Sequence, residues 1–106
     1  MLPNDMIYIL TLMDKPGGLP LRLRIRPEHK AYLAAVADRI AFAGPLTTDD
    51  GQTMIGSVLA IDFESRDAAH AWLASEPFTL AGLYASISVN AFVNLWPQTA
   101  GFVPAA

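Results

Sequence analysis

The sequence contains no cysteine and only two histidines among 106 residues. Without cysteine, disulfide bonds, thiolate zinc sites and cysteine nucleophiles are all excluded. Two histidines are too few for a histidine-rich metal cluster, although mixed histidine and carboxylate ligation stays open. We therefore expect neither a metal site nor an organic cofactor.

Long apolar runs are missing as well. No segment approaches the ~20 apolar residues that a membrane-spanning helix needs. The apolar run at 6–13 lacks a basic leader, because the first lysine, Lys15, follows it. This run is typical of a strand and not of a signal peptide. The sequence thus predicts a cytoplasmic protein by default.

Charge is scarce and slightly negative. Ten acidic against seven basic residues give a net charge of −3, which disfavours nucleic acid or an anionic membrane as partner. Charged residues make up 16% of the chain and hydrophobic residues 53%, a composition that excludes intrinsic disorder. We expect one domain over 1–106, with a core at about 6–95 and an irregular tail at 96–106.

The surplus of apolar residues also bears on assembly. A monomer of this size buries only about 60–65% of the surface that its unfolded chain exposes. Few charged side chains remain to cover the outside. We therefore expect a homodimer in which a second subunit hides one apolar face.

Periodicity predicts six main elements in the order β-α-β-β-α-β. Strands are expected at 6–13, 41–47, 54–63 and 84–95. The first helix should begin at Pro27, because proline suits the first helical position. Apolar spacing then continues the helix through Leu33, Val36, Ala37 and Ile40. Ser65 is a good N-cap for the second helix, which Pro77 ends.

The segment 19–27 is ambiguous. Arg22, Arg24 and Arg26 alternate there with apolar residues, a pattern that fits a short extended stretch or a mobile loop. The three arginines could bind an anionic substrate, or they could simply face solvent.

The element order is that of the ferredoxin-like α+β fold, with an antiparallel sheet and helices on one face only. The other face of such a sheet must be solvated or covered. Two sheets packed face to face would form a dimeric α+β barrel, which agrees with the expected homodimer.

His29 is the first candidate for chemistry. On an ideal helix it shares a face with Leu33, Val36 and Ile40, and so points toward the sheet. A histidine in such a place is a reasonable general base, although it could equally be a structural residue bonded to a loop carbonyl.

Asp38 and Ser57 are weaker candidates. Asp38 follows His29 by nine residues, which on one helix places the two about 180° apart. The two could cooperate only if His29 preceded the regular helix or if Asp38 acted on a partner subunit. Otherwise Asp38 is a solvated surface residue. Ser57 shares a strand face with Leu59 and Ile61, where it could line a pocket or merely fill the sheet surface.

A set of short motifs, in order and spacing, resembles the YciI-like family of YCII-related domains. These motifs cover roughly residues 6–93 and include Arg26-Pro27-Glu28-His29, Asp38, Ala43-Gly44-Pro45-Leu46, Gly56-Ser57, Ala68-Ala69-His70-Ala71-Trp72, Glu76-Pro77-Phe78 and Val89-Asn90-Ala91-Phe92.

The resemblance implies a dimeric α+β barrel akin to muconolactone isomerase. It implies His29 and Asp38 as the catalytic pair and Ser57 as a pocket residue. We expect Arg26 and Phe78 as further substrate contacts, with Arg26 meeting an anionic oxygen of the substrate. One branch of the family is similar to a dehydrochlorinase that needs no metal or organic cofactor. Glu76 stands where an aspartate is commoner, and we expect it not to contact His29.

Two functions follow as hypotheses. The first is a cofactor-free lyase or isomerase that acts on a small cyclic or aromatic compound through its His/Asp pair. The alternative is a non-catalytic module that binds a small ligand in the same cleft. A haem or copper monooxygenase is a weaker third option, because no ligand set is evident.

Overall fold

The computed structural model describes residues 6–96. Its elements are β1 (Met6–Asp14), α1 (Leu19–Ala34), the 3₁₀ turn η1 (Ala37–Arg39), β2 (Ile40–Thr47), β3 (Met54–Phe63), α2 (Arg66–Ala74), α3 (Pro77–Leu80) and β4 (Tyr84–Phe92). The predicted α+β fold with its βαββαβ order is therefore confirmed. The dimeric α+β barrel stays a prediction.

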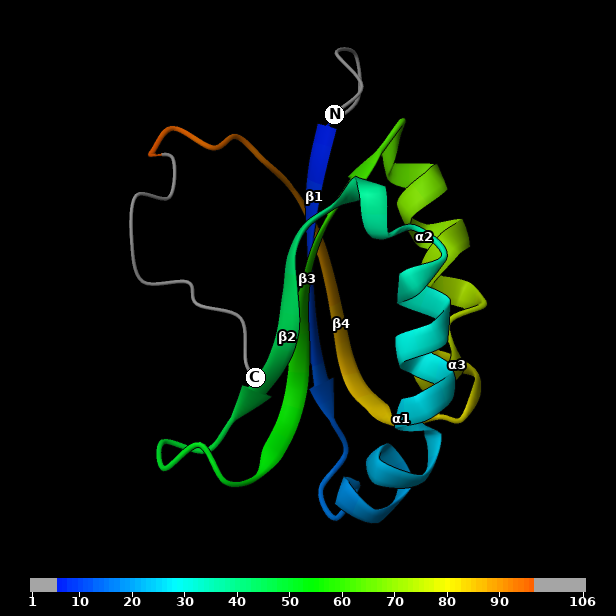
Figure 1. Cartoon of the computed structure of the whole chain (residues 1–106), viewed down its shortest axis with the longest axis vertical. Helices are drawn as coiled ribbons and strands as arrows, with labels where there is room; N and C mark the ends of the chain where they lie inside the picture. Colours follow the sequence, from blue (N-terminus) through cyan, green and yellow to red (C-terminus); the bar gives the residue numbers. More distant parts are fainter. Residues whose placement is uncertain (1–5, 97–106) are drawn as a thin grey trace.

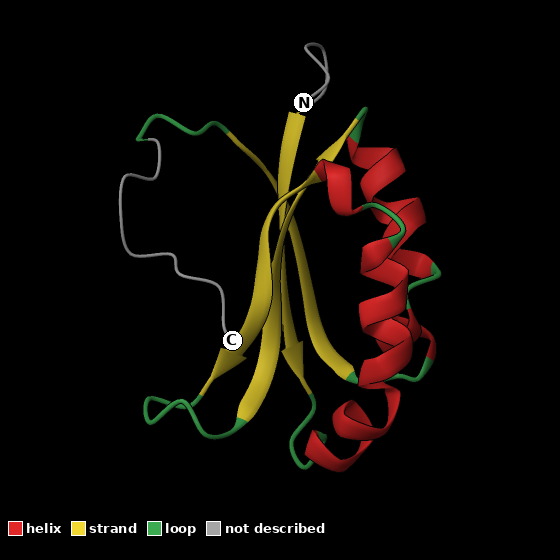
Figure 2. Ribbon diagram, in the orientation of Figure 1, coloured by secondary structure: helices red, strands yellow, loops and turns green. Residues whose placement is uncertain are grey.

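The four strands form one antiparallel sheet in the order β2-β3-β1-β4. All helices lie on one face of this sheet, so the protein has two layers (Figures 1 and 2). Register fixes which side chains face the helices. Leu10 pairs with Leu59 and Val89, and Leu12 pairs with Ser57. Cross-strand partners share a face, so these residues all point toward the helical layer.

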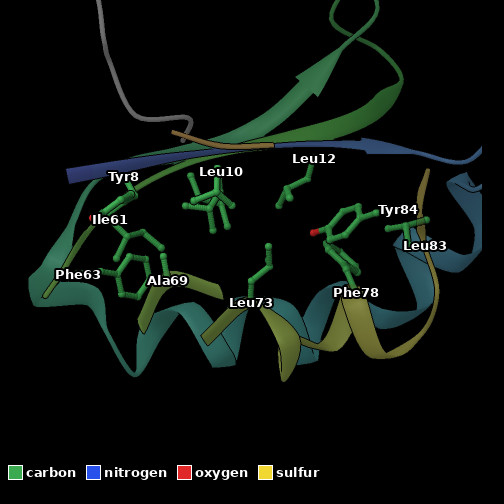
Figure 3. Close-up of a cluster of buried hydrophobic side chains, with 12 residues drawn as sticks. Tyr8, Leu10, Leu12, Ile61, Phe63, Ala69, Leu73, Phe78, Leu83 and Tyr84 are labelled. Atoms are coloured by element: carbon green, nitrogen blue, oxygen red, sulfur yellow. The ribbon is translucent and has the colours of Figure 1, made fainter. Parts of the chain in front are cut away.

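The hydrophobic core fills the space between the two layers (Figure 3). It is built from alternate residues of the central strands and from the inner faces of α2 and α3, where Ala69, Leu73 and Phe78 are buried. Ser65 caps α2 as predicted, because its hydroxyl accepts a hydrogen bond from the Ala68 amide at 3.0 Å.

The start of the first helix differs from the prediction. It begins at Leu19, so that Pro27 lies inside it. Pro20 lies in the first turn of α1, where proline is favoured. The alternation of arginine with apolar residues had suggested an extended stretch. Tertiary contacts outweigh that local pattern, because Leu21 and Ile25 pack on the core.

The end of the first helix differs too. α1 stops at Ala34, and η1 separates it from β2. Val36 and Ile40, predicted on the helical stripe, therefore lie outside it. The last strand ends at Phe92 and not at residue 95. Of the predicted irregular tail, all but Trp96 lies outside the described residues. Over 6–96, none of the helices has the length and apolar character to cross a membrane.

Candidate active site

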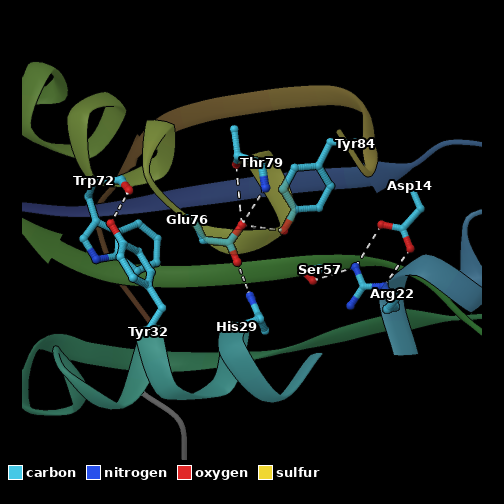
Figure 4. Close-up of polar contacts among 9 residues, drawn as sticks. All are labelled: Asp14, Arg22, His29, Tyr32, Ser57, Trp72, Glu76, Thr79 and Tyr84. Carbon is cyan, nitrogen blue, oxygen red and sulfur yellow. Dashed lines mark hydrogen bonds and ion pairs between the residues drawn. The ribbon is translucent and has the colours of Figure 1, made fainter. Parts of the chain in front are cut away.

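His29 projects from α1 into the molecule, as the helical spacing predicted. It is 7% exposed, and its ring stacks on Phe78 with 4.1 Å between centroids and 19° between planes. Nδ1 forms a short contact with Oε1 of Glu76 (Figure 4). The expectation that Glu76 would not contact His29 is therefore wrong.

Glu76 is fully buried between α2 and α3. It is the N-cap of α3, and its Oε2 accepts a hydrogen bond from the Thr79 amide at 3.1 Å. The same oxygen accepts from the Tyr84 hydroxyl at 3.4 Å. A buried carboxylate needs such partners on both oxygens. Glu76 has them, and its orientation toward His29 is fixed as a result.

Tyr84 completes this arrangement from the start of β4. Burial, and secondly the nearby Glu76 carboxylate, raise the pKa of Tyr84 well above its usual range, although the Arg22 guanidinium and the Ser57 hydroxyl oppose the shift. The phenol therefore keeps its proton at neutral pH. It acts as a hydrogen-bond donor to Glu76.

The second ring nitrogen of His29 is in a different situation. Nε2 makes no hydrogen bond within residues 6–96, and it is not a fully enclosed atom. When Nδ1 carries a proton and donates it to Glu76, Nε2 is left as an acceptor with a free lone pair. A fixed imidazole with one free nitrogen is the arrangement that general-base catalysis requires.

A second polar cluster centres on Arg22, which lies seven residues before His29 on α1. Its side chain is 1% exposed. Nε and Nη2 bond the two carboxylate oxygens of Asp14 at 2.6 and 2.9 Å, and Nη2 also bonds Ser57 Oγ at 3.0 Å. The sequence had left Arg22 as a substrate contact or a solvent-facing residue. In the structure it forms a buried ion pair instead.

Phe78 separates the two clusters. The Arg22 guanidinium lies 4.6 Å from the centre of its ring, and the His29 ring lies 4.1 Å from it. Arg22 and His29 are two turns of α1 apart, about 10 Å along the helix axis. Both side chains nevertheless pack on the same Phe78 ring, which helps to fix the position of each.

The remaining predicted site residues are scattered. Asp38 is exposed on η1, and within 6–96 no hydrogen bond or ion pair joins it to His29. Ser57 is buried against Arg22. Arg26 is half-buried on α1. The structure thus brings His29 and Phe78 together, and it places Ser57 beside Arg22.

Sequence reasoning named Arg22 and Glu76 but predicted the buried polar contacts of neither. Arg22 precedes His29 by seven residues, which on a helix gives it nearly the same direction, but this signal depends on α1 starting before Arg22. Glu76 lies 47 residues beyond His29. The only available signal was an acidic residue before Pro77, at a helix start.

The surface of the described residues includes two hollows that bear on the site. One, of about 360 Å³, is lined by Leu23, Arg26, Pro27 and Lys30 on α1. The other, of about 320 Å³, is lined by residues 14–19 and 53–55. Neither reaches His29 directly. No group of three or more potential metal-ligating side chains gathers within 6–96.

Comparison with known proteins places these features in context. Residues 6–93 match the YCII-related domain. Protein YciI of Escherichia coli is 36% identical over 98 residues, which cover 86% of this chain and all of the relative. An uncharacterized protein of Haemophilus influenzae is 33% identical over the same shares of both chains.

Two solved structures share the fold of this chain. The 5-chloro-2-hydroxyhydroquinone dehydrochlorinase of Burkholderia phenoliruptrix, in complex with 2,5-dihydroxybenzoquinone, is 34% identical with a TM-score of 0.78, covering 83% of this chain and 94% of that one. A protein of Mycobacterium tuberculosis is 18% identical with a TM-score of 0.50, covering 90% of this chain and 99% of that one. The latter likeness concerns the fold alone.

Proposed function

Because the chain belongs to the family of YCII-related domains, we propose that it is a lyase or isomerase acting on a small hydroxylated ring compound without a cofactor. His29 is the catalytic base, and Glu76 positions it. The observation that carries the proposal is the imidazole itself, whose Nδ1 bonds a buried carboxylate and whose Nε2 makes no hydrogen bond to residues 6–96. The structurally similar dehydrochlorinase, whose name specifies an aromatic substrate, supports the substrate class.

The proposed reaction needs only proton transfers. Nε2 removes a proton from a ring hydroxyl and returns it to the ring carbon that bears a leaving group. It then takes a proton from a second hydroxyl, while the leaving group departs as an anion with its bonding electrons. The net loss is one molecule of acid, HX. Without a leaving group, the first two transfers give an isomerisation.

Glu76 would act on His29 throughout this cycle. Its carboxylate keeps the Nδ1 proton in place and stabilises the imidazolium that forms after each proton abstraction. The Thr79 amide and the Tyr84 hydroxyl hold the carboxylate in turn. The catalytic role that the resemblance implies for Asp38 stays a prediction, and the orienting role passes to Glu76.

The main test replaces His29 with Asn and measures chloride release from 5-chloro-2-hydroxyhydroquinone. A general base contributes about 10²–10⁴ in rate, so we expect the His29→Asn variant to lose that factor. The exposed His70, on α2, supplies the matched control His70→Asn, which should behave as wild type. Equal turnover in both variants contradicts the proposal. Binding of 2,5-dihydroxybenzoquinone without any turnover would favour the non-catalytic binding module.

The positioning role of Glu76 has its own test. We expect Glu76→Gln to lower kcat by about tenfold or more and to shift the pH dependence of kcat/KM, because the imidazolium loses its counter-charge. Glu76→Asp restores the residue commoner in the resembling family and should recover part of the activity. An unchanged pH profile in Glu76→Gln would leave Glu76 with a structural role only.

We also propose that the chain forms a homodimer through the open face of the sheet. That face carries the half-buried apolar side chains Ile7, Ile9 and Val58 in its two central strands. It also carries Asp62, which is 3% exposed and whose Oδ1 has no hydrogen-bond partner among residues 6–96. Light scattering should give twice the 11.4 kDa chain mass, and a single-chain mass at all concentrations would refute the dimer.

A further inference from the structure

Part of the helix-facing side of the sheet is uncovered along edge strand β2. Ala43 pairs with Leu59 and Pro45 pairs with Ser57. Cross-strand partners share a face, so Ala43 and Pro45 point toward the helical layer. Leu59 and Ser57 are buried there, whereas Ala43 and Pro45 are exposed. The helical layer therefore stops short of β2 and leaves an open strip beside α1.

α1 turns one flank to its neighbours and the other toward this strip. The Tyr32 hydroxyl donates to the Trp72 carbonyl of α2 at 2.7 Å, so the Tyr32 flank faces α2. Arg26 lies six residues before Tyr32, about 120° around the helix, with His29 about midway between them. Figures 1 and 4 show α1 over the β2 side of the sheet and α2 over the β4 side. The Arg26 flank thus borders the open strip.

His29 lies level with Ala43 along this strip. Arg22 bonds Ser57, and Ser57 is the cross-strand neighbour of Pro45, so Arg22 and Pro45 stand at the same height. From Arg22 to His29 the helix rises about 10 Å, which corresponds to about three strand residues. α1 runs antiparallel to β2 (Figure 1), so this rise leads back from Pro45 to about Phe42, and the adjacent Ala43 is the residue there that faces the helices.

The Arg26 flank is also hollow and positively charged. The hollow of about 360 Å³ is lined by Leu23, Arg26, Pro27 and Lys30, with two cations and no carboxylate. Arg26 has no hydrogen bond or ion pair within the described residues, so its guanidinium is available to a ligand.

From these placements, we propose that the strip between α1 and β2 is the substrate slot and that it takes a flat, anionic single-ring compound. The ring lies on Ala43 and Pro45, its anionic oxygen meets Arg26, and one ring hydroxyl reaches His29 Nε2. The small side chain of Ala43 sets the width of the slot. This inference rests on the proposed function for the identity of the base. It adds where the substrate enters the site and that the substrate is anionic.

The slot is tested by the reactivity of His29 and not by turnover. Diethyl pyrocarbonate acylates accessible, unprotonated imidazole nitrogens, and the chain has only His29 and His70. The exposed His70 is therefore an internal reference in peptide mapping. We expect wild-type His29 to react, and Ala43→Trp to slow that reaction by about tenfold relative to His70, equivalent to ~1.4 kcal/mol in the barrier.

The matched control lies on the opposite edge of the sheet. Ala91 pairs with Tyr8, faces the helical layer and is exposed on β4. Ala91→Trp should leave the His29 rate at the wild-type value. Ala43→Leu, a milder change that the edge strand tolerates more easily, should give an intermediate rate. An unreactive His29 in the wild type, or equal rates in Ala43→Trp and Ala91→Trp, would overturn the slot.

Ligand binding separates this inference from the proposed function. We expect Ala43→Trp and Arg26→Gln each to weaken 2,5-dihydroxybenzoquinone binding by about tenfold or more. If Ala43→Trp shields His29 while His29→Asn keeps full turnover, the slot stands and the proposed chemistry fails. If His29 is essential for turnover and Ala43→Trp does not shield it, the chemistry stands and the slot fails.

Discussion

Two side chains of α1, Arg22 and His29, each form a pair with a carboxylate. The pairs differ in whether the basic side chain keeps a nitrogen lone pair without a hydrogen-bond partner in the described residues. Arg22 bonds both oxygens of Asp14 and also Ser57, all within the buried layer. His29 bonds Glu76 through Nδ1, whereas its Nε2 has no hydrogen-bond partner in the described part of the chain. Both side chains pack on Phe78.

This difference suits the Arg22 pair to a structural role and the His29 pair to proton transfer. Arginine stays protonated at any physiological pH and has no lone pair to accept a proton. The Arg22 pair can therefore only hold the fold together. A neutral imidazole has one nitrogen with a lone pair that can accept a proton, so a fixed His29 can exchange protons through Nε2. One helix thus supplies both a rigid anchor and a candidate base, two turns apart.

The largest effect on stability is expected from replacing Arg22, and it tests the structural role of the Arg22 pair. We expect Arg22→Met to lower the free energy of unfolding by about 3–5 kcal/mol, because Asp14 is left buried without a counter-charge. Denaturant unfolding followed by circular dichroism measures this. Arg24→Met, at an exposed position of the same helix, is the control, and an equal loss in both would show that Arg22 is not an anchor.

The pair itself can also be removed. Replacing a buried ion pair by apolar residues of similar size is often neutral or stabilising. The double variant Asp14→Leu with Arg22→Met should therefore recover much of the stability that Arg22→Met loses, in the same denaturant measurement. A double variant no more stable than Arg22→Met would show that the unpaired Asp14 carboxylate does not cause the loss in the free energy of unfolding.

Tyr84 gives a smaller, pH-dependent effect. Its pKa is raised in the folded protein, mainly by burial and then by Glu76. Above pH ~10 the unfolded chain loses the phenolic proton while the folded chain keeps it, so stability falls by up to ~1.4 kcal/mol per pH unit. Tyr84→Phe should flatten this alkaline loss in thermal unfolding at pH 9–11. The same slope in both proteins would contradict the assignment.

The smallest effect is expected at Asp38. It is exposed on η1, so Asp38→Asn should change turnover by less than about twofold, within the range of surface substitutions. The measurement is kcat with the same chlorinated substrate as for His29→Asn. A loss as large as that of His29→Asn would instead support the catalytic role that the resemblance implies for Asp38.

Much of the fold could be predicted because it depends on short-range patterns. Period-two alternation located β3 and most of β4, and the Ser65 cap located α2. The start of α1 could not be predicted in this way. Its first two turns owe their position to Arg22 and to apolar contacts with the core, and such partners are invisible in a local window.

The sequence by itself determined the element order, the single-faced helical layer and the inward direction of His29. These follow from residue periodicity, which is a property of neighbouring positions. Only the tertiary structure decided that Glu76 and not Asp38 is the carboxylate beside His29. That contact joins residues 47 positions apart, and no helical or strand period relates two residues that meet only when the sheet brings α1 and α3 together.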